Sequence, residues 1–580
     1  MRRGGPEKWA GVYVLILYIL DRMHMRFPAL HILFAALLLL PAGAAAQPQI
    51  ITPAIQSAMQ RVSADSLLRH AGILASDTME GRGTGREGAQ RAAAYLSAEL
   101  ARLGLLPVEN DSSYLQRFPL HGSFPLPESR LTLYDGDAEI PLTLGEDYTL
   151  YKTGDQTFIP RPLRLVFVGY GIVAPEYDYN DYQNINVENA VVVYLSGEPA
   201  SEDAGYFDGP QPTIYSIPEM KQRIALTRGA RGSIMLPLPR VERGYTWKDW
   251  QRIFSFEDVK LPITTPGHLS VLLRPKRTDA LFRGSKYTYE DVLRMDSTGS
   301  VRSFPLQTRT SFSGVFRERD FLAANVMAAL PGSDPLLRDS WIICSAHYDH
   351  LGIGPAADAD SIYNGFVDNA IGCASLLELA RVLKTGNLRL RRSVLFLFVT
   401  GEEKGLLGSQ YYCANPAVPL HRSIANLNVD GLAIIDTFDD MVGIGAEYST
   451  MKRHLERLAT ELGMSVSQIP PEFNLMEAFA SSDQISFAQA GIPSLLIMEG
   501  PRYRNLGREE GMARFLRWGE ERYHSPRDDA GQPVNPAAVR QHAEILFAYL
   551  AAVANTYEPP QWVRGSRFIN ARLQSLAEER

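Results

Sequence analysis

Three stretches of the sequence decide the fold: WIICSAHYDHLG at 341–352, NAIGCASLLELARVLK at 369–384 and SVLFLFVTGEE at 393–403. The first and third begin with unbroken apolar runs, which are typical of strands buried on both faces of a sheet. The middle stretch carries leucines at helical spacing, with Glu378 and Arg381 among the polar positions, and this pattern predicts an amphipathic helix. A strand, a helix and a second strand in that order predict an α/β fold.

The same alternation continues toward the C-terminus. It predicts further strands at 423–431, 441–446 and 494–500, and helices at 451–462 and 485–490. The fold class is therefore α/β, with a mixed and mostly parallel sheet flanked by helices. In such a sheet, ligands bind at the carboxyl ends of the strands.

Two segments precede this region. Residues 66–103 have apolar residues at helical spacing, interrupted by EGRGTGREG at 80–88. The glycines fit GxGxxG, but no strand precedes them, so we interpret the segment as a turn between two helices rather than a dinucleotide site. Residues 125–316 show short β-branched and aromatic runs with one helix at 219–228. They predict a mostly β insert, and because it has no cluster of histidines, cysteines or paired carboxylates, we expect no chemistry in it.

Polar side chains that bind metals follow the predicted strands. They are His347 and Asp349 after the first strand, Asp368 at the start of the helix, Glu402 and Glu403 after the next strand, Asp430 at the end of 423–431, and His524 in RYHSPRDD at 522–529. The two histidines with any three of these five carboxylates, and no cysteine, suit two zinc-like ions, which accept nitrogen and oxygen at about 2.0–2.2 Å. Two dications roughly 3.5–4 Å apart need a bridging carboxylate. Singly, each residue also fits a structural role, such as a core histidine or a helix cap.

Five motifs in the same order carry a family resemblance. SAHYDHLG, YNGFVDNAIG, VTGEEKGLLGS, NLNVDG and YHSPRDD resemble the signature segments of the M28 family of co-catalytic zinc exopeptidases, the aminopeptidase and glutamate-carboxypeptidase relatives. The resemblance covers most of residues 60–560. Within it, the insert at 125–316 resembles the protease-associated domain of many members.

The resemblance implies a role for each position. His347 and Asp430 match ligands of one zinc, Glu403 and His524 match ligands of the other, Asp368 matches the bridging carboxylate, Glu402 matches the general base, and Asp349 and Asp528 match the residues that orient His347 and His524. A carboxylate bound to metal loses basicity, whereas its unbound neighbour accepts a proton from the attacking water. The implied cofactors are two Zn²⁺ per chain.

The sequence departs from the family pattern near its C-terminal motifs. Gln484 follows Ser482 and Asp483 where the family often has histidine, and Ala480 stands where some aminopeptidases have a tyrosine for the oxyanion. Tyr523 and Tyr503 are alternative oxyanion partners, although a packing role is expected for either. His350, beside the first motif, is a further candidate for contact with the site.

Composition and the N-terminal segment limit the possible partners and the cellular location of the protein. The 580 residues carry 58 Lys plus Arg against 65 Asp plus Glu with no basic run, which argues against a nucleic-acid partner. Arg26, an apolar run at 32–40 and small residues before Gln47 predict a secretory signal, too short for a membrane anchor. The predicted domains are 1–46 (signal, with Met25 the suspected start), 47–124 (catalytic, first part), 125–316 (insert), 317–557 (catalytic, zinc-binding part) and 558–580 (tail).

The leading functional hypothesis is an exported, periplasmic or secreted di-zinc aminopeptidase that acts on peptides. A carboxypeptidase of the glutamate-carboxypeptidase type remains open, because arginines crowd residues 502–517 and a substrate carboxylate needs a cationic partner. A glutaminyl-cyclase-like transferase would use one zinc, and a non-catalytic ectodomain would need none. The oligomeric state is not predicted.

Overall fold

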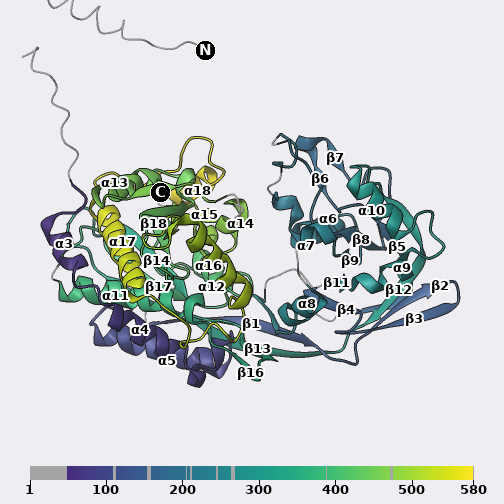
Figure 1. Cartoon of the computed structure of the whole chain (residues 1–580), viewed down its shortest axis with the longest axis horizontal. Helices are drawn as coiled ribbons and strands as arrows, with labels where there is room; N and C mark the ends of the chain where they lie inside the picture. The colour runs from purple at the N-terminus through teal and green to yellow at the C-terminus, as the bar shows by residue number, and fades with distance from the viewer. Residues whose placement is uncertain are drawn as a thin grey trace, which may run out of the picture. The chain divides into compact units, whose positions relative to one another are not determined.

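A mixed sheet with helices on both faces carries the predicted α/β fold (Figure 1). The computed structural model describes residues 49–108, 113–152, 158–203, 205–209, 212–242, 246–262, 268–386, 388–470 and 475–578. The predicted signal, 1–46, lies outside the described residues. Among the described residues nine strands form this sheet, in the order β10 (Asp258–Lys260), β1 (Leu115–Pro125), β13 (Phe316–Leu330), β17 (Ser393–Val399), β14 (Trp341–His347), β18 (Ser423–Asn428), β21 (Ser494–Glu499), β19 (Asp440–Ile444) and β20 (Ser465–Ser467).

The apolar run of β17 is buried on both faces, as its composition predicts. Val394, Phe396 and Phe398 belong to one hydrophobic core, whereas Leu395 and Leu397 belong to another on the opposite face. Side chains alternate along a strand, so a strand covered on both sides has no polar face. The first core includes helices α4 (Ala64–Leu74), α11 (Ile371–Thr385) and α17 (Pro536–Asn555), and the second includes residues of α12 (Leu407–Ala414) and α15 (Gln484–Gln489).

The parallel part of the sheet lies at its centre. Strand β14 pairs in parallel with β17 on one side and β18 on the other, and β18 pairs in parallel with β21. The pairings of β1, β13 and β19 with their neighbours toward the flanks include antiparallel ones, so the sheet is mixed. Because β17, β14 and β18 run in the same direction, their carboxyl ends meet at one edge.

A second sheet is formed within the predicted insert. Its strands, in order, are β3 (Ala138–Thr143), β2 (Arg130–Asp135), β12 (Phe304–Ser313), β5 (Phe158–Phe167), β8 (Val191–Leu195), β9 (Gly232–Leu236), β11 (Leu269–Leu273) and β4 (Tyr148–Lys152). Helices α6 (Pro218–Thr227), α7 (Pro239–Glu242), α8 (Trp247–Ile253), α9 (Thr278–Phe282) and α10 (Tyr289–Ser297) accompany it, so this segment is more helical than its sequence predicts. Strands β1 and β13, which enter and leave the segment, pair with each other.

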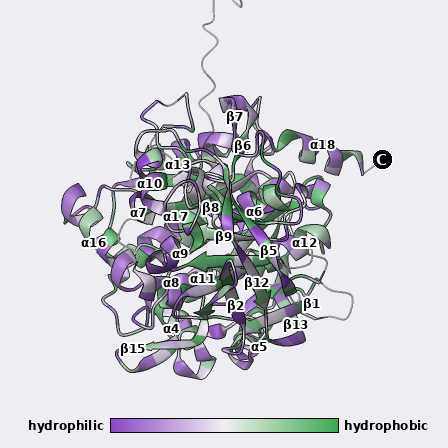
Figure 2. Ribbon diagram, turned by 90° about the vertical axis from the view of Figure 1, so that its right-hand side faces the viewer, coloured by the Kyte–Doolittle hydropathy of each residue, from purple (hydrophilic) through white to green (hydrophobic). Residues whose placement is uncertain are grey.

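Further described elements lie outside the predicted insert. They are α3 (Pro53–Met59), α5 (Glu87–Arg102), α13 (Met451–Glu461), α14 (Leu475–Ala480), α16 (Gly507–Glu521), α18 (Ile569–Ala577) and the hairpin β15 (Gly352–Ala357) with β16 (Asp360–Tyr363). Residues 558–578 pack on the molecule, since Arg572 of α18 donates to the carbonyls of Leu420 and Ser423. No described helix has the length and apolarity needed to cross a membrane. Figure 2 shows hydrophobic residues gathered on the inner strands and hydrophilic ones on outer helices.

Candidate metal centre

The carboxyl ends of three neighbouring strands bring the predicted site residues together. Strand β14 ends at His347, β17 is followed by Glu402 and Glu403, and Asp430 lies two residues after β18. The register places His347 opposite Val399 of β17. The sheet topology therefore brings His347 and Asp430 into contact, although they lie 83 positions apart in sequence.

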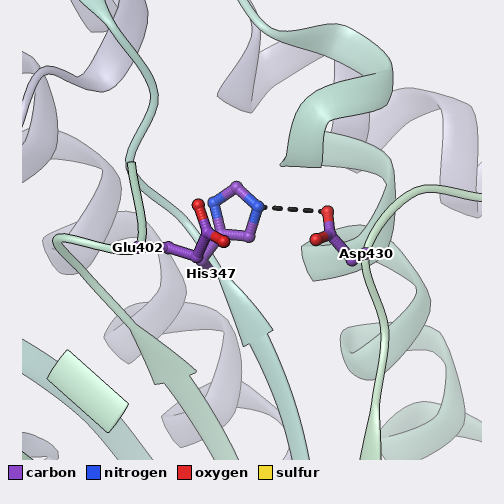
Figure 3. A group of neighbouring side chains, drawn as sticks. All are labelled: His347, Glu402 and Asp430. Carbon is purple, nitrogen blue, oxygen red and sulfur yellow. Dashed lines mark hydrogen bonds and ion pairs between the residues drawn. The ribbon is translucent and has the colours of Figure 1, made fainter. Parts of the chain in front are cut away.

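The first group of side chains surrounds His347. Its Nε2 lies 3.1 Å from Asp430 Oδ1 and 3.3 Å from Asp368 Oδ1. Figure 3 shows His347 and Asp430 facing each other across this contact, with Glu402 beside the imidazole. His347 Nδ1 lies 3.1 Å from the carbonyl oxygen of Asp349, which only accepts, so Nδ1 donates to it and Nε2 is the atom that faces the carboxylates.

The second group surrounds His524. Its Nε2 lies 3.2 Å from Asp368 Oδ2 and 3.3 Å from Glu403 Oε2. The two oxygens of Asp368 thus face different histidines, which is the arrangement that a bridging carboxylate requires. Tetrahedral ligands at 2.0–2.1 Å from an ion lie about 3.3 Å apart, so both groups have the spacing of a zinc coordination shell.

Asp368 precedes α11, in the turn Phe366–Ala370, and is held by its backbone. The carboxylate of Asp528 accepts from the N–H groups of Val367 and Asp368, each at 3.0 Å. The sequence resemblance assigns Asp528 to the orientation of His524; its hydrogen bonds in the structure are instead with the segment that carries Asp368 and with Gln532. Asp528 therefore positions the segment that presents the Asp368 carboxylate.

His350 is part of the centre. It is fully buried, and its Nδ1 lies 2.7 Å from Glu403 Oε1 and 3.8 Å from Asp368 Oδ2. Its spacing from Glu403 is too short for two ligands of one tetrahedral ion and matches a hydrogen bond. Nδ1 thus donates to Oε1 and leaves Oε2 of Glu403 free to face His524.

The carboxylates of the centre have opposite electrostatic environments. Burial, reinforced by Asp430 and Glu403, raises the pKa of Glu402 well above its ordinary value against the lowering effect of His347. For Asp368, burial is outweighed by the surrounding histidines, which hold its pKa well below the ordinary value. A carboxylate held charged suits a metal ligand, whereas one with a raised pKa suits proton transfer.

Of the two candidate oxyanion partners, Tyr523 lies at the centre. Its ring stacks on His524 with centroids 3.9 Å apart. Although Tyr523 is 47% exposed, desolvation of its hydroxyl and the carboxylates of Asp368 and Glu403 raise its pKa well above the ordinary value, so the hydroxyl is a donor at neutral pH. Tyr503 instead neighbours Glu499 and Asp440.

Two residues near the centre were missed from the sequence. Arg82 is completely buried and donates to the carbonyl oxygens of Gly365 and Asp368. Thr84 Oγ1 donates to Asp349 Oδ2 at 2.9 Å. Both belong to EGRGTGREG, where the glycines indicate only a turn. The one sequence feature that could have drawn attention to Arg82 is its place between two glycines, and that feature does not show whether the side chain is buried or exposed.

Part of the chain is similar to known peptidases. Residues 325–550 match the family model of Peptidase family M28. Leupeptin-inactivating enzyme 1 of Streptomyces exfoliatus is 26% identical over 275 residues, 46% of this chain and 55% of that protein. Aminopeptidase YwaD of Bacillus subtilis (strain 168) is 24% identical over 298 residues, 49% of this chain and 53% of that protein. The chain thus spans about half the length of these curated relatives.

A solved structure shares the fold. The aminopeptidase from Aneurinibacillus sp. strain AM-1 aligns with a TM-score of 0.52 at 16% identity, covering 88% of this chain and 96% of that one. The mixed α/β architecture predicted from the sequence is thereby confirmed. Over residues 325–550 the chain is similar to peptidase family M28.

Proposed function

We propose that this protein is a zinc-dependent exopeptidase with two Zn²⁺ per chain, and that it removes N-terminal residues from peptides. The observation that carries the proposal is that Asp368 faces His347 with one oxygen, at 3.3 Å, and His524 with the other, at 3.2 Å. Glu402 lies beside His347 and Asp430. The curated relatives that match the chain include an aminopeptidase. The proposed ligands are His347, Asp368 and Asp430 for one ion and His524, Asp368 and Glu403 for the other.

Zinc, when bound, would activate a water and polarise the scissile carbonyl. Glu402, beside His347 and Asp430, would accept a proton from the water and deliver it to the leaving amine, acting first as base and then as acid. Asp349 accepts from the Glu402 N–H at 3.2 Å and so holds its backbone. Tyr523 donates to the carbonyl oxygen as negative charge develops there.

The test is product analysis with zinc-loaded protein. Peptide mixtures and aminoacyl amides should lose N-terminal residues one at a time, and a chelator should stop the reaction. N-acetylated peptides should resist cleavage, whereas C-amidated peptides should be cleaved. Absence of hydrolysis across this panel with two zinc ions bound would contradict the proposal.

One pocket favours the carboxypeptidase as the second candidate. It has a volume of about 450 Å³ and is lined by Ile434, Ile435, Val534, Arg514, Arg517 and Arg522 together with Glu521 and Trp518. Trp518 Nε1 donates to Gln532, which donates to Asp528, so the pocket is linked by hydrogen bonds to the segment carrying Asp368. Arginines beside apolar side chains suit a C-terminal carboxylate.

Blocked dipeptides separate the two candidates. A carboxypeptidase would cleave N-acetylated dipeptides and spare C-amidated ones, which is the reverse of the leading expectation. In that case Arg517→Gln should raise KM more than Arg514→Gln, because Arg514 is already paired with Glu510 at 2.7 Å. A cyclase-type transferase would bind one zinc per chain, and a binding ectodomain would show no turnover.

We also infer that the protein is exported, on the strength of the basic, apolar and small-residue segments at 26–46. N-terminal sequencing of the protein from its native host should then begin at Gln47. A mature protein that retained residues 25–46 would contradict this inference.

A further inference from the structure

The glycine-rich segment 80–88 lies outside the region matched by the family model, yet it reaches the metal centre. Arg82 directs all five N–H donors of its guanidinium at backbone carbonyls. Nε donates to Tyr348 at 2.7 Å, Nη1 to Leu74 at 2.8 Å and Asn364 at 2.5 Å, and Nη2 to Gly365 at 2.7 Å and Asp368 at 3.5 Å. A planar five-donor group is the only side chain that satisfies five acceptors in this way, since lysine has three donors.

The five carbonyls belong to three separate segments. Leu74 ends helix α4, Tyr348 directly follows the proposed ligand His347, and the other three carbonyls lie in the loop 364–368 that presents Asp368. One buried side chain thus ties an N-terminal helix to both sides of the proposed coordination shell. Displacement of the loop would move the carboxylate that both ions share.

The backbone around Arg82 leaves little room for another arrangement. Gly365 has a φ of +60°, and a Cβ there would overlap the Asp368 carbonyl oxygen and the His350 ring. Gly81 also has a φ of +60°, and a Cβ there would overlap the carbonyl oxygens of Tyr363 and Gly352. These glycines allow the segment 80–82 and the loop 364–368 to approach closely.

Thr84 extends the same segment toward Glu402. Its hydroxyl, which is buried, donates to Asp349 Oδ2 at 2.9 Å, and Asp349 Oδ1 accepts from the Glu402 N–H at 3.2 Å. His350 is joined to the segment as well, because its N–H donates to the Arg82 carbonyl. The charged neighbours of Arg82 are the carboxylates of Asp368, Asp528 and Asp349.

We propose that Arg82 and Thr84 are positioning residues of the active centre: Arg82 holds the loop that presents the bridging Asp368, and Thr84 holds Asp349 behind Glu402. This inference rests on the proposed two-zinc function. Both residues would act by keeping the metal-binding side chains in place. Removal of hydrogen bonds that orient metal ligands changes metal affinity or activity by about 10–100-fold.

The experiment compares two buried arginines. Arg82→Lys and Arg82→Met are set against Arg392→Lys and Arg392→Met, because Arg392 is also buried and donates to the backbone carbonyls of Thr556 and Tyr557. Zinc content, zinc affinity by chelator competition and melting temperature are measured for each full-length protein. Both pairs should lower the melting temperature, but only the Arg82 variants should bind zinc about 10–100-fold more weakly.

Thr84→Val tests the second half of the proposal and does not depend on the stability of the Arg82 variants. It should retain two zinc ions and wild-type KM but lose about tenfold in kcat, and Thr84→Ser should restore the rate. Wild-type kcat in Thr84→Val would overturn the role of Thr84.

The outcomes separate this inference from the proposed function. A wild-type protein that binds no zinc and hydrolyses no peptide would contradict the function itself. A wild-type protein with two zinc ions, beside a folded Arg82→Lys variant of equal zinc affinity, would overturn the role of Arg82 alone.

Discussion

At the residue scale, the centre assigns different tasks to two adjacent glutamates. Glu403 receives a hydrogen bond from His350 on one oxygen and faces His524 with the other, so both of its oxygens are engaged. Glu402 contributes to neither contact, and its carboxylate lies beside His347 and Asp430 (Figure 3). Both glutamates follow the end of β17, but they contact different histidines: Glu403 contacts His350 and His524, whereas Glu402 lies beside His347.

Glu402→Gln should abolish turnover without loss of metal. The amide accepts no proton from water, so kcat should fall by about 10²–10⁴-fold while the zinc content stays at two per chain. Steady-state kinetics and metal analysis of the same preparation check both halves. Activity equal to wild type would show that the base is misassigned.

Tyr523→Phe isolates the proposed oxyanion donor. Removal of one such donor costs about 10²–10³-fold in kcat, so a comparable loss is expected with little change in KM. Tyr503→Phe is the matched control, because Tyr503 is also a tyrosine of the same region but its neighbours are Glu499 and Asp440. Equal losses in the two variants would contradict a specific role for Tyr523.

Four of the proposed ligands, His347, Asp368, Glu403 and Asp430, were predictable because each is a metal-binding residue type beside a predicted strand or helix. His524 lies beside neither, and only the family resemblance assigned it. The positioning residues were not predictable, because the identity of a partner such as Asp528 for the Asp368 backbone depends on how the loop 364–368 closes. Arg82 is the extreme case. A buried arginine that binds five carbonyls has no sequence pattern, since its acceptors are backbone groups shared by all residues.

At the scale of elements, the strands were predicted closely where they are buried on both faces. The run at 341–347 coincides with β14, and 393–400 differs from β17 by one residue. The flanks were less predictable: β1, β13 and β10 pair antiparallel at the edge of the sheet, and no local pattern fixes such long-range pairing. The helices α7–α10 of the insert were missed because they are short, with at most nine residues each.

Helix α6 of the insert carries a buried lysine with a consequence for stability. Lys221 Nζ donates to the carbonyls of Leu195 and Gly197, and burial lowers its pKa to about 7. The unfolded chain keeps a lysine pKa near 10.4, so between these values it binds more protons than the folded chain. Stability should therefore rise as the pH rises from 7 to 9, by at most about 1.4 kcal/mol per pH unit.

Lys221→Met should remove that dependence, which melting temperatures at pH 7, 8 and 9 would reveal. Lys452→Met is the control, because Lys452 and its partner Glu456 are both 53% exposed. The control should keep the wild-type slope. A slope unchanged in Lys221→Met would show that the buried ammonium does not control stability in this range.

At the scale of the whole molecule, the proposed centre concentrates carboxylates inside the fold. Asp368 and Asp349 are buried, Glu402 and Glu403 are only partly exposed, and all lie at the edge where β17, β14 and β18 end. Without zinc, the neighbouring histidines and Arg82 offset only part of the repulsion between these carboxylates. Binding of zinc should therefore stabilise the entire catalytic part rather than a single loop.

Metal removal tests this global linkage. At free zinc 100-fold above the dissociation constant, each ion should add about 2.7 kcal/mol to the free energy of unfolding, so a chelator should lower the melting temperature and added zinc should restore it. Magnesium should restore little, because it prefers six oxygen ligands. Asp368→Asn weakens both sites at once because the two ions share this side chain, and its melting temperature should respond far less to zinc. If zinc raised the melting temperature of Asp368→Asn as much as that of wild type, the stabilising ions would bind elsewhere and the bridging role of Asp368 would be wrong.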